Sequence, residues 1–191
     1  MTGLIAVTPD TLEKHGFFCK MSARKTSAWQ DKREWMLARF AEGMELRLLG
    51  GKERGFVEFM PASQCWRAIE DADDLMAIHC IWVVGKSKGQ GHARTLLEEV
   101  ERTARARGFN GITVLASKGN WLAKPALFAH FGFEMVEETA PGFALMVKRF
   151  APGPTPRLSG GWAAKAAACG AGLTVLRSAQ CPYLEDAAEH V

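Results

Sequence analysis

The sequence lacks any hydrophobic run long enough to cross a membrane, and it lacks a strong excess of one charge. No apolar stretch approaches the roughly 18 residues that a membrane-spanning helix needs, and the N-terminal residues contain no signal-peptide core. The 24 Lys and Arg are nearly balanced by 21 Asp and Glu, which leaves a net charge of +3. A nucleic-acid-binding protein usually concentrates basic residues on one face. We therefore expect neither a membrane nor a nucleic acid as a partner.

Cysteine pairs are missing as well. The five cysteines are odd in number, and they form neither a Cys-x-x-Cys pair nor a spacing typical of Cys/His metal sites. Disulfide bonds persist mainly in oxidising compartments, so this usage favours free thiols in a reducing environment. We expect a cytoplasmic protein without a bound metal. The cysteines are Cys19, Cys65, Cys80, Cys169 and Cys181.

A basic turn that contains glycine stands out at residues 86–93, Lys-Ser-Lys-Gly-Gln-Gly-His-Ala. Residues 77–84 before it are rich in β-branched and aromatic side chains, as in a largely buried strand. From residue 93 to about 107, apolar side chains recur at helical spacing. The turn is therefore predicted to connect a buried strand to a long helix.

The chemistry of this turn suits a phosphorylated ligand. The first N–H groups of a helix have no partner within the helix, and the helix dipole adds a partial positive charge there. Gly89 and Gly91 remove side chains that would keep an anion from the backbone, and Lys86 and Lys88 add positive charge. The same glycines could serve turn geometry alone, so the turn by itself leaves both interpretations open.

Two familiar phosphate-binding motifs do not match. A P-loop requires Lys and then Ser or Thr after its last glycine, where this sequence has His92 and Ala93. A Rossmann fingerprint requires a further Gly or Ala at the position of Arg94. The turn instead resembles the Gln/Arg-x-x-Gly-x-Gly/Ala motif of the GCN5-related N-acetyltransferase (GNAT) superfamily, with Lys86 in the place of Gln or Arg.

Other segments extend the resemblance over roughly residues 1–150. Phe131-Gly132-Phe133-Glu134 is similar to the Gly-Phe signature that closes the family's acetyl-CoA domain. Upstream of the turn, segments 55–61, 65–67 and 78–83 resemble the YoaP-like branch of the superfamily. Downstream of the turn, we expect a strand at 112–116, a loop at 117–120 and a helix at 122–130.

The resemblance implies an α/β (α+β) GNAT fold, in which a mixed central β-sheet with splayed parallel strands is flanked by helices, plus a short C-terminal extension. We expect a GNAT acetyltransferase domain at 1–150, a Pro/Gly-rich linker at 151–161 and a partial YoaP-like C-terminal segment at 162–191. This last segment would be a truncated thioredoxin-like appendage. The further elements expected are a strand at 4–7, two helices within 11–42, a hairpin of 44–49 and 54–60, a helix at 162–168, a strand at 173–176 and a helical patch from Cys181.

The resemblance also implies transfer of an acetyl group from acetyl-CoA to a primary amine of a small molecule by direct attack. The pantetheine arm would enter the gap between strands 78–84 and 112–116, and the pyrophosphate would bind at the turn. Backbone N–H groups near Trp82 and Val83 would stabilise the tetrahedral oxyanion. A homodimer is a further expectation. The expected cofactor-binding residues are Trp82, Val83, Lys88, Gly89, Gln90, Gly91, His92, Ala93 and Asn120.

Catalysis needs a base, because an alkylamine with a pKa near 10 is mostly protonated at pH 7. Glu58 is the first candidate, since strand alternation places it on the opposite sheet face from Val57 and Phe59. His79, in the strand before the turn, is the second candidate. Each has a structural alternative: Glu58 could be an exposed strand carboxylate, and His79 a hydrogen-bonded core residue.

The proton donor departs from the family pattern. Many relatives carry a proton-donating Tyr at the helix position that holds Phe128 here, so the proton would come from water, from His130 or from another group. The acceptor is equally open. Trp66 and Arg67 could hold a carboxylate-bearing acceptor, because a planar guanidinium beside an indole suits that group, although aromatic residues more often serve packing.

Two other functions stay open at this stage. The missing Tyr would suit a CoA-binding sensor or an inactive GNAT domain that regulates an attached module. The Cys181-Pro182 pair at an expected helix start would suit a thiol-based redox or metalloid-handling protein, because a helix N-terminus lowers a thiol pKa. Against this alternative, Leu184 occupies the position of the second cysteine of a Cys-x-x-Cys motif.

Overall fold

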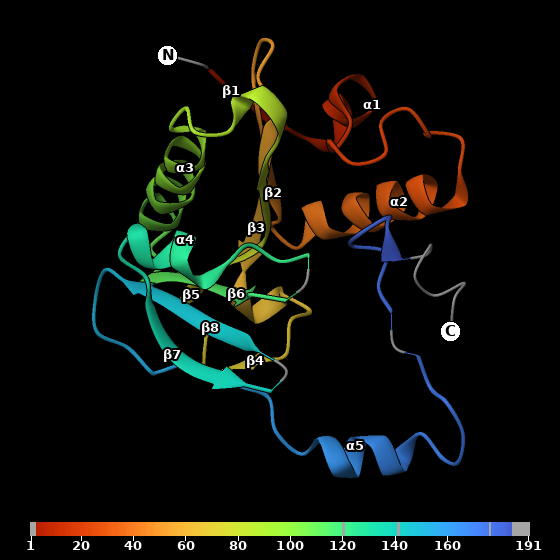
Figure 1. The fold of residues 1–191 in the computed structure, drawn as a ribbon, viewed down its shortest axis with the longest axis vertical. Coiled ribbons are helices and arrows are strands. Elements are labelled where there is room, and N and C mark those ends of the chain that lie inside the picture. Colours follow the sequence, from red (N-terminus) through yellow and green to blue (C-terminus); the bar gives the residue numbers. More distant parts are fainter. Residues whose placement is uncertain (1–2, 120, 141, 176, 185–191) are drawn as a thin grey trace.

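The computed structural model describes residues 3–119, 121–140, 142–175 and 177–184. A seven-stranded sheet with the order β1-β2-β3-β5-β6-β8-β7 forms its centre (Figure 1). The strands of this sheet are β1 (Leu4–Val7), β2 (Glu45–Leu49), β3 (Gly55–Pro61), β5 (Leu75–Val83), β6 (Gly111–Ser117), β7 (Glu134–Thr139) and β8 (Phe143–Arg149). The helices are α1 (Leu12–His15), α2 (Ser27–Ala41), α3 (His92–Ala106), α4 (Pro125–His130) and α5 (Trp162–Ala168), with 3₁₀ turns η1 (Pro9–Thr11), η2 (Ala62–Gln64) and η3 (Gly85–Ser87).

Each face of the sheet is covered by helices. Helices α3 and α4 lie on one face and α1 and α2 on the other (Figure 1). Strand β3 supplies both cores because its side chains alternate: Val57 and Phe59 pack toward α3, and Phe56 and Met60 toward α2. The core under α3 also contains Leu96, Leu97, Val100, Ile78 and Phe128, and the core under α2 contains Trp29, Met36, Leu46 and Leu12.

The pair β5–β6 is parallel, whereas the other strand pairs of the described sheet are antiparallel. Its pairing ends at Ile78 and Val114, although β5 continues to Val83 and β6 to Ser117. Beyond that point β5 pairs with β3 and β6 with β8. The two strands therefore splay, as predicted, and leave a gap in the middle of the sheet.

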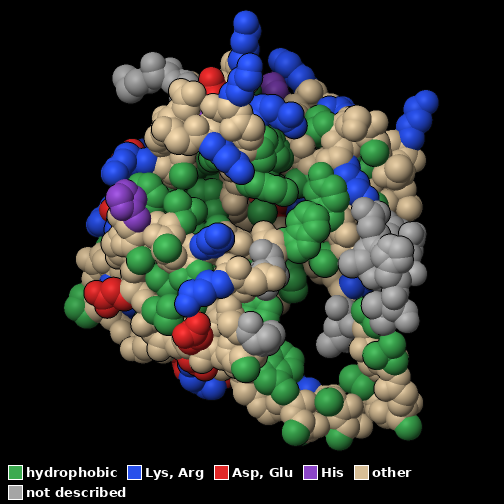
Figure 2. Space-filling model, viewed as in Figure 1, with side chains coloured by type: hydrophobic (Ala, Val, Ile, Leu, Met, Phe, Trp, Pro, Cys, Tyr) green, Lys and Arg blue, Asp and Glu red, His purple; other side chains and the backbone are tan. Residues whose placement is uncertain are grey.

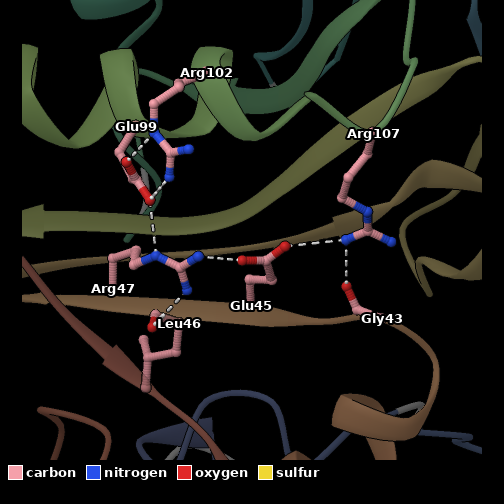
Figure 3. Close-up of polar contacts among 7 residues, drawn as sticks. All are labelled: Gly43, Glu45, Leu46, Arg47, Glu99, Arg102 and Arg107. Atoms are coloured by element: carbon pink, nitrogen blue, oxygen red, sulfur yellow. Dashed lines mark hydrogen bonds and ion pairs between the residues drawn. The ribbon is translucent and has the colours of Figure 1, made fainter. Parts of the chain in front are cut away.

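A network of ion pairs ties α3 to β2 (Figure 3). The Arg47 guanidinium on β2 donates from Nε to Glu99 of α3 at 2.9 Å and also pairs with Glu45. Arg102 donates to the same Glu99 carboxylate, and Arg107 after α3 reaches Glu45 at 3.1 Å. Because Arg47, Glu45 and Glu99 are partly buried, their pairs fix the helix against the sheet more firmly than isolated surface pairs would. The middle and the C-terminal end of α3 are thereby held against β2.

Several sequence-based expectations for the main sheet are confirmed. The strand at 4–7, the two helices within 11–42 and the β2–β3 hairpin are all present. The helix expected from residue 122 starts at Pro125, which suits the first helical position because proline has no N–H to leave unpaired there. Strands β7 and β8 were not predicted; β8 lies between β6 and β7, so its place depends on pairing with a strand about 30 residues earlier.

The C-terminal part departs from expectation. Residues 157–158, within the predicted linker, form strand β9 (Arg157–Leu158), which pairs with β4 (Ile69–Glu70). Residues 173–175 of the predicted strand are exposed and not in a strand, and Leu176 lies outside the described residues. Helix α5 forms as expected but buries none of its side chains. The chain then returns, and residues 177–184 lie beside α2 (Figure 1).

Candidate active site

A cleft of about 1040 Å³ begins at the splayed strands and continues over the glycine turn to α4. Its walls come from β5, from the turn and the start of α3, and from the loop and helix after β6. Figure 2 shows hydrophobic side chains in a hollow of this face, with Lys and Arg side chains around its edge. The cleft thus joins an apolar channel to a basic rim, which suits a ligand with an apolar arm and a charged end.

The turn itself has the geometry of an anion cradle. Gly89 and Gly91 adopt left-handed backbone conformations, with φ of +74° and +80°, and Gly91 is the N-cap of α3. A Cβ atom on Gly91 would meet no atom within 4 Å, so the space above the first turn of α3 is open. The buried Ser87 hydroxyl accepts the N–H of Arg54 at 2.9 Å and anchors the turn to the loop before β3. Free N–H groups and a helix dipole face this open space.

The structure brings most of the expected cofactor-binding residues together. Gln90 is the exception among those described, because it does not line the cleft and its side-chain Nε2 donates to the Lys86 carbonyl at 3.0 Å. Asn120 lies outside the described residues. The expected residues that line the cleft are Trp82, Val83, Lys88, Gly89, Gly91, His92 and Ala93.

The backbone of β5 beyond the splay offers donors to the gap. Val84 donates its N–H to the Arg54 carbonyl at 3.0 Å, and the Trp82 carbonyl lies beside Gly55 of β3. Because successive residues of a strand direct their polar groups to opposite sides, the N–H groups of Trp82 and Val84 face β3. The N–H group of Val83 faces the gap instead, which favours it over Trp82 as a donor to a ligand there.

On the α2 side of the sheet, four polar side chains meet in a buried group that we call the Glu58 cluster: Lys32, Glu58, His79 and Gln180. Lys32 of α2 donates to Glu58 Oε2 at 2.5 Å, and Gln180 of the C-terminal segment donates to Glu58 Oε1 at 2.9 Å. Lys32, Glu58 and His79 are each 2% exposed. The cluster is therefore closed to bulk water.

A β-bulge brings His79 to this cluster. Glu58 is paired with Cys80, and the next residue of β3 is paired with Ile78, so His79 is an extra residue in β5. A bulge turns a side chain away from simple alternation. His79 Nδ1 lies 3.7 Å from Glu58 Oε1, too far for a hydrogen bond, and neither ring nitrogen has a hydrogen-bond partner among the described residues.

The charges of the cluster follow from its contacts. Burial raises the pKa of Glu58, but the Lys32 ammonium and the neighbouring His79 outweigh burial and lower that pKa to about 2. Burial lowers the pKa of His79, and the positive charges of Arg67 and Lys32 lower it further against the opposing effect of Glu58. At neutral pH the cluster therefore contains an ammonium, a carboxylate and a neutral imidazole.

The remaining candidates lie in several places. Phe128 is fully buried and packs edge-on against Phe133, with ring centroids 5.5 Å apart. His130 lines the cleft. Tyr183, the only tyrosine of the chain, stacks on Trp121 at the cleft wall, with ring centroids 5.7 Å apart.

Sequence reasoning missed Lys32 and Gln180. A lysine on an amphipathic helix usually faces water, and no local pattern marks it as buried. Gln180 is separated from Glu58 by 122 residues, so only the fold brings the two together. Two aromatic residues lie near the cluster: the ring centroids of Trp35 and Trp66 are 6.1 and 6.3 Å from that of the His79 ring.

The described residues contain no group of His, Cys, Asp or Glu that could hold a metal ion. All five cysteines are free thiols. Within the described ranges, no helix is both long and apolar enough to span a bilayer.

Known proteins resemble this chain in sequence and in fold. "Uncharacterized N-acetyltransferase YoaP" of Bacillus subtilis (strain 168) is 35% identical over 145 residues, which cover 74% of this chain and 57% of that protein. The chain thus spans little more than half the length of this relative.

Solved structures share the fold at low sequence identity. A ribosomal-protein-alanine N-acetyltransferase from Brucella melitensis superimposes with a TM-score of 0.57 and 20% identity, over 78% of this chain and 99% of that one. YncA, a putative acetyltransferase from Salmonella typhimurium solved with acetyl-CoA, gives a TM-score of 0.56 and 16% identity, over 82% and 98%.

The family is decided by sequence. The profile of the acetyltransferase (GNAT) family matches residues 13–133, more than half of the chain. This range includes strands β2 to β6, the glycine turn, α4 and the Phe131-Gly132-Phe133 segment. The splayed strands and the cradle at the start of α3 lie within the same range. The chain therefore belongs to the acetyltransferase (GNAT) family.

Proposed function

We propose that this protein transfers an acetyl group from acetyl-CoA to a primary amine of a small molecule by direct attack of the amine on the thioester. The observation that carries the proposal is the single cleft that joins the splay of β5 and β6 to the glycine turn of α3. An apolar channel that ends at a basic helix N-terminus suits an apolar arm bearing a pyrophosphate. The neighbour from Salmonella typhimurium, solved with acetyl-CoA, supports this choice of ligand.

In this proposal the two ends of acetyl-CoA bind to different groups. The pyrophosphate lies over Lys88, Gly89 and Gly91, where open space meets free N–H groups. The pantetheine arm fills the gap between β5 and β6. The N–H group of Val83 donates to the thioester carbonyl and stabilises the oxyanion as charge develops on it.

His79 and Glu58 share the task of receiving the proton. His79 does not line the cleft and its side chain is buried, so the amine must displace groups that cover it. Its imidazole is neutral, and neither nitrogen has a hydrogen-bond partner among the described residues, so it can then accept a proton from the amine. The Glu58 carboxylate, 3.7 Å away, then stabilises the imidazolium, whereas Glu58 itself is a weak base because its pKa is about 2. The N–C bond forms as the C–S bond breaks, and the CoA thiolate leaves.

Direct attack is favoured over a route through an acylated cysteine. Cys80 lines the cleft, but burial raises its pKa, so it remains a thiol rather than a nucleophilic thiolate. Burial likewise raises the pKa of Cys19 to about 12. The leaving CoA thiol has a pKa near 8.5, so its thiolate needs no proton donor at the position of Phe128.

We assign the acetyltransferase domain to residues 1–150, with 162–191 as an appended C-terminal segment after the 151–161 linker. The appended segment reaches the cluster on the α2 side of the domain through the hydrogen bond from Gln180 to Glu58. A chain truncated after residue 150 would therefore lack one group of the Glu58 cluster.

The proposal is tested by turnover of acetyl-CoA with a panel of primary amines, with thiol release followed by Ellman's reagent and acetylated products identified by mass spectrometry. We expect amine-dependent thiol release and one acetyl group added to the amine. CoA binding without thiol release from any amine would contradict the proposal and favour a CoA-binding sensor. Alkylation of Cys181 should leave turnover unchanged, whereas its loss would favour the thiol-dependent alternative.

A further inference from the structure

Arg67 carries a charge that has no counterion among the residues that the structure describes. It follows η2, and its guanidinium lies against the Trp66 ring at 4.5 Å from the centroid. One nitrogen, Nη2, donates to the His79 carbonyl at 3.0 Å, whereas Nε is fully buried and has no hydrogen-bond partner. Arg67 forms no ion pair within the part of the chain that the structure describes.

The charges around Arg67 do not balance. Glu58 is the carboxylate of the neighbouring cluster, and the Lys32 ammonium already neutralises it at 2.5 Å. His79 is neutral, and Cys65 and Cys80 are thiols whose pKa values are raised by burial. Among the described residues, one positive charge therefore remains in a largely buried region. Unpaired charge is costly to bury, so a site of this kind is normally completed by an anion.

The position of Arg67 relates this missing anion to the proposed reaction. Its partner carbonyl belongs to His79, whose buried imidazole has no hydrogen-bond partner within the described ranges. The next residue, Cys80, lines the cleft. An anionic group held by Arg67 would thus lie beside the proposed base and one residue from the cleft.

Trp66 marks the side from which such a molecule can enter. It is 42% exposed although it stacks on a largely buried guanidinium. The planar guanidinium can present two N–H donors to two oxygens of a carboxylate, a geometry that lysine cannot reproduce.

We infer that Arg67 binds the carboxylate of the acceptor, and that the acceptor is a small amine with a carboxylate close to its amino group, as in an α-amino acid. This inference rests on the proposed acetyl transfer and deepens it by naming the substrate class. In this inference the carboxylate binds Arg67 and the amine approaches His79, whose ring neighbours the Trp35 and Trp66 rings.

The test compares acceptors that differ only in the charged group. Acetyl-CoA turnover is measured on the full chain with a panel of α-amino acids, and with the carboxamide and the decarboxylated amine of each, at equal concentrations of neutral amine. We expect kcat/KM for the amino acid to exceed that for both analogues by at least about tenfold. Equal or better turnover of the uncharged analogues would overturn the inference while leaving acetyl transfer intact.

A matched pair of variants locates the effect. Arg67→Gln should raise KM for the amino acid by on the order of 100-fold and leave the uncharged analogues unchanged, whereas Arg33→Gln, which alters an exposed ion pair on α2, should change neither. Retained CoA binding shows that Arg67→Gln is folded. A uniform loss with all acceptors would overturn the role of Arg67, and if this variant fails to fold, the wild-type acceptor comparison still decides. No thiol release with any amine would contradict the proposed function itself.

Discussion

Glu58 is a buried carboxylate that two side chains from distant parts of the chain bind, Lys32 at one oxygen and Gln180 at the other. The Lys32 ammonium, with His79 beside it, lowers the pKa of Glu58 to about 2 in spite of burial. The sequence predicted that Glu58 lies on the opposite face from Val57 and Phe59, because alternation is local. It could not predict Lys32 as the partner, because that contact joins a helix and a strand 26 residues apart.

The lowered pKa of Glu58 makes the free energy of unfolding depend on pH. Above pH 4.5, the ordinary value for Glu, the carboxylate is ionised in both the folded and the unfolded chain, and its contacts contribute fully. As pH falls from 4.5 toward 2, the unfolded chain binds the proton first and this contribution is lost. At roughly 1.36 kcal/mol for each pKa unit, the free energy of unfolding falls by about 3 kcal/mol over this range.

Glu58→Gln should remove this part of the pH dependence. Urea unfolding between pH 7 and pH 2 measures it, with Glu34→Gln, an exposed carboxylate of α2, as the control that keeps the wild-type slope. Glu58→Gln should also be less stable than wild type at pH 7, since it leaves the Lys32 ammonium buried without a counterion. An identical slope below pH 4.5 in wild type and Glu58→Gln would refute the ion pair.

His79 should control the rate rather than cofactor binding. His79→Gln keeps a polar side chain but cannot take up a proton, so we expect kcat to fall by about 100-fold with unchanged CoA affinity. Because burial lowers the pKa of His79, wild-type kcat/KM per neutral amine should stay level at neutral pH and decline only below pH 6.5. Full turnover by His79→Gln would exclude it as the base; His15→Gln on α1 serves as the control.

At the scale of elements, the glycine turn was predictable and the C-terminal segment was not. The turn depends on residues next to one another, so strand, glycines and helix could be recognised in sequence. The splay of β5 and β6 was expected through the family resemblance, and the end of pairing at Ile78 and Val114 confirms it. The return of residues 177–184 to α2 depends on contacts over more than 100 residues, which no local pattern encodes.

Substitutions of Gln180 test whether residues 177–184 bind Glu58. Gln180→Ala removes one hydrogen bond and should lower the free energy of unfolding by about 1 kcal/mol. Gln180→Glu places a second carboxylate against Glu58, so at pH 7 it should lower the free energy of unfolding more than Gln180→Ala does. At pH 4 the decrease should be smaller, because protonation of the introduced carboxylate relieves the repulsion. Equal stability of Gln180→Glu and wild type at pH 7 would show that the segment does not bind Glu58 in solution.

At the scale of the whole molecule, the proposed donor and acceptor sites lie along one strand. Strand β5 directs Val83 to the gap and His79 to the Glu58 cluster, with Cys80 between them at the cleft wall. The ion pairs between β2 and α3 hold this helix, whose first residue follows the glycine turn, against the sheet (Figure 3). The proposed acetyl transfer therefore requires that CoA binds at this turn.

Calorimetric titration of CoA into wild type, Gly91→Glu and Gly108→Glu tests this claim most directly. The two glycines share an exposed, left-handed backbone conformation, with φ of +80° and +78°, at opposite ends of α3, so the variants carry the same backbone strain and charge. We predict wild-type affinity for Gly108→Glu and at least about a tenfold loss for Gly91→Glu, whose carboxylate enters the anion cradle. Wild-type affinity in Gly91→Glu would contradict the placement of the pyrophosphate.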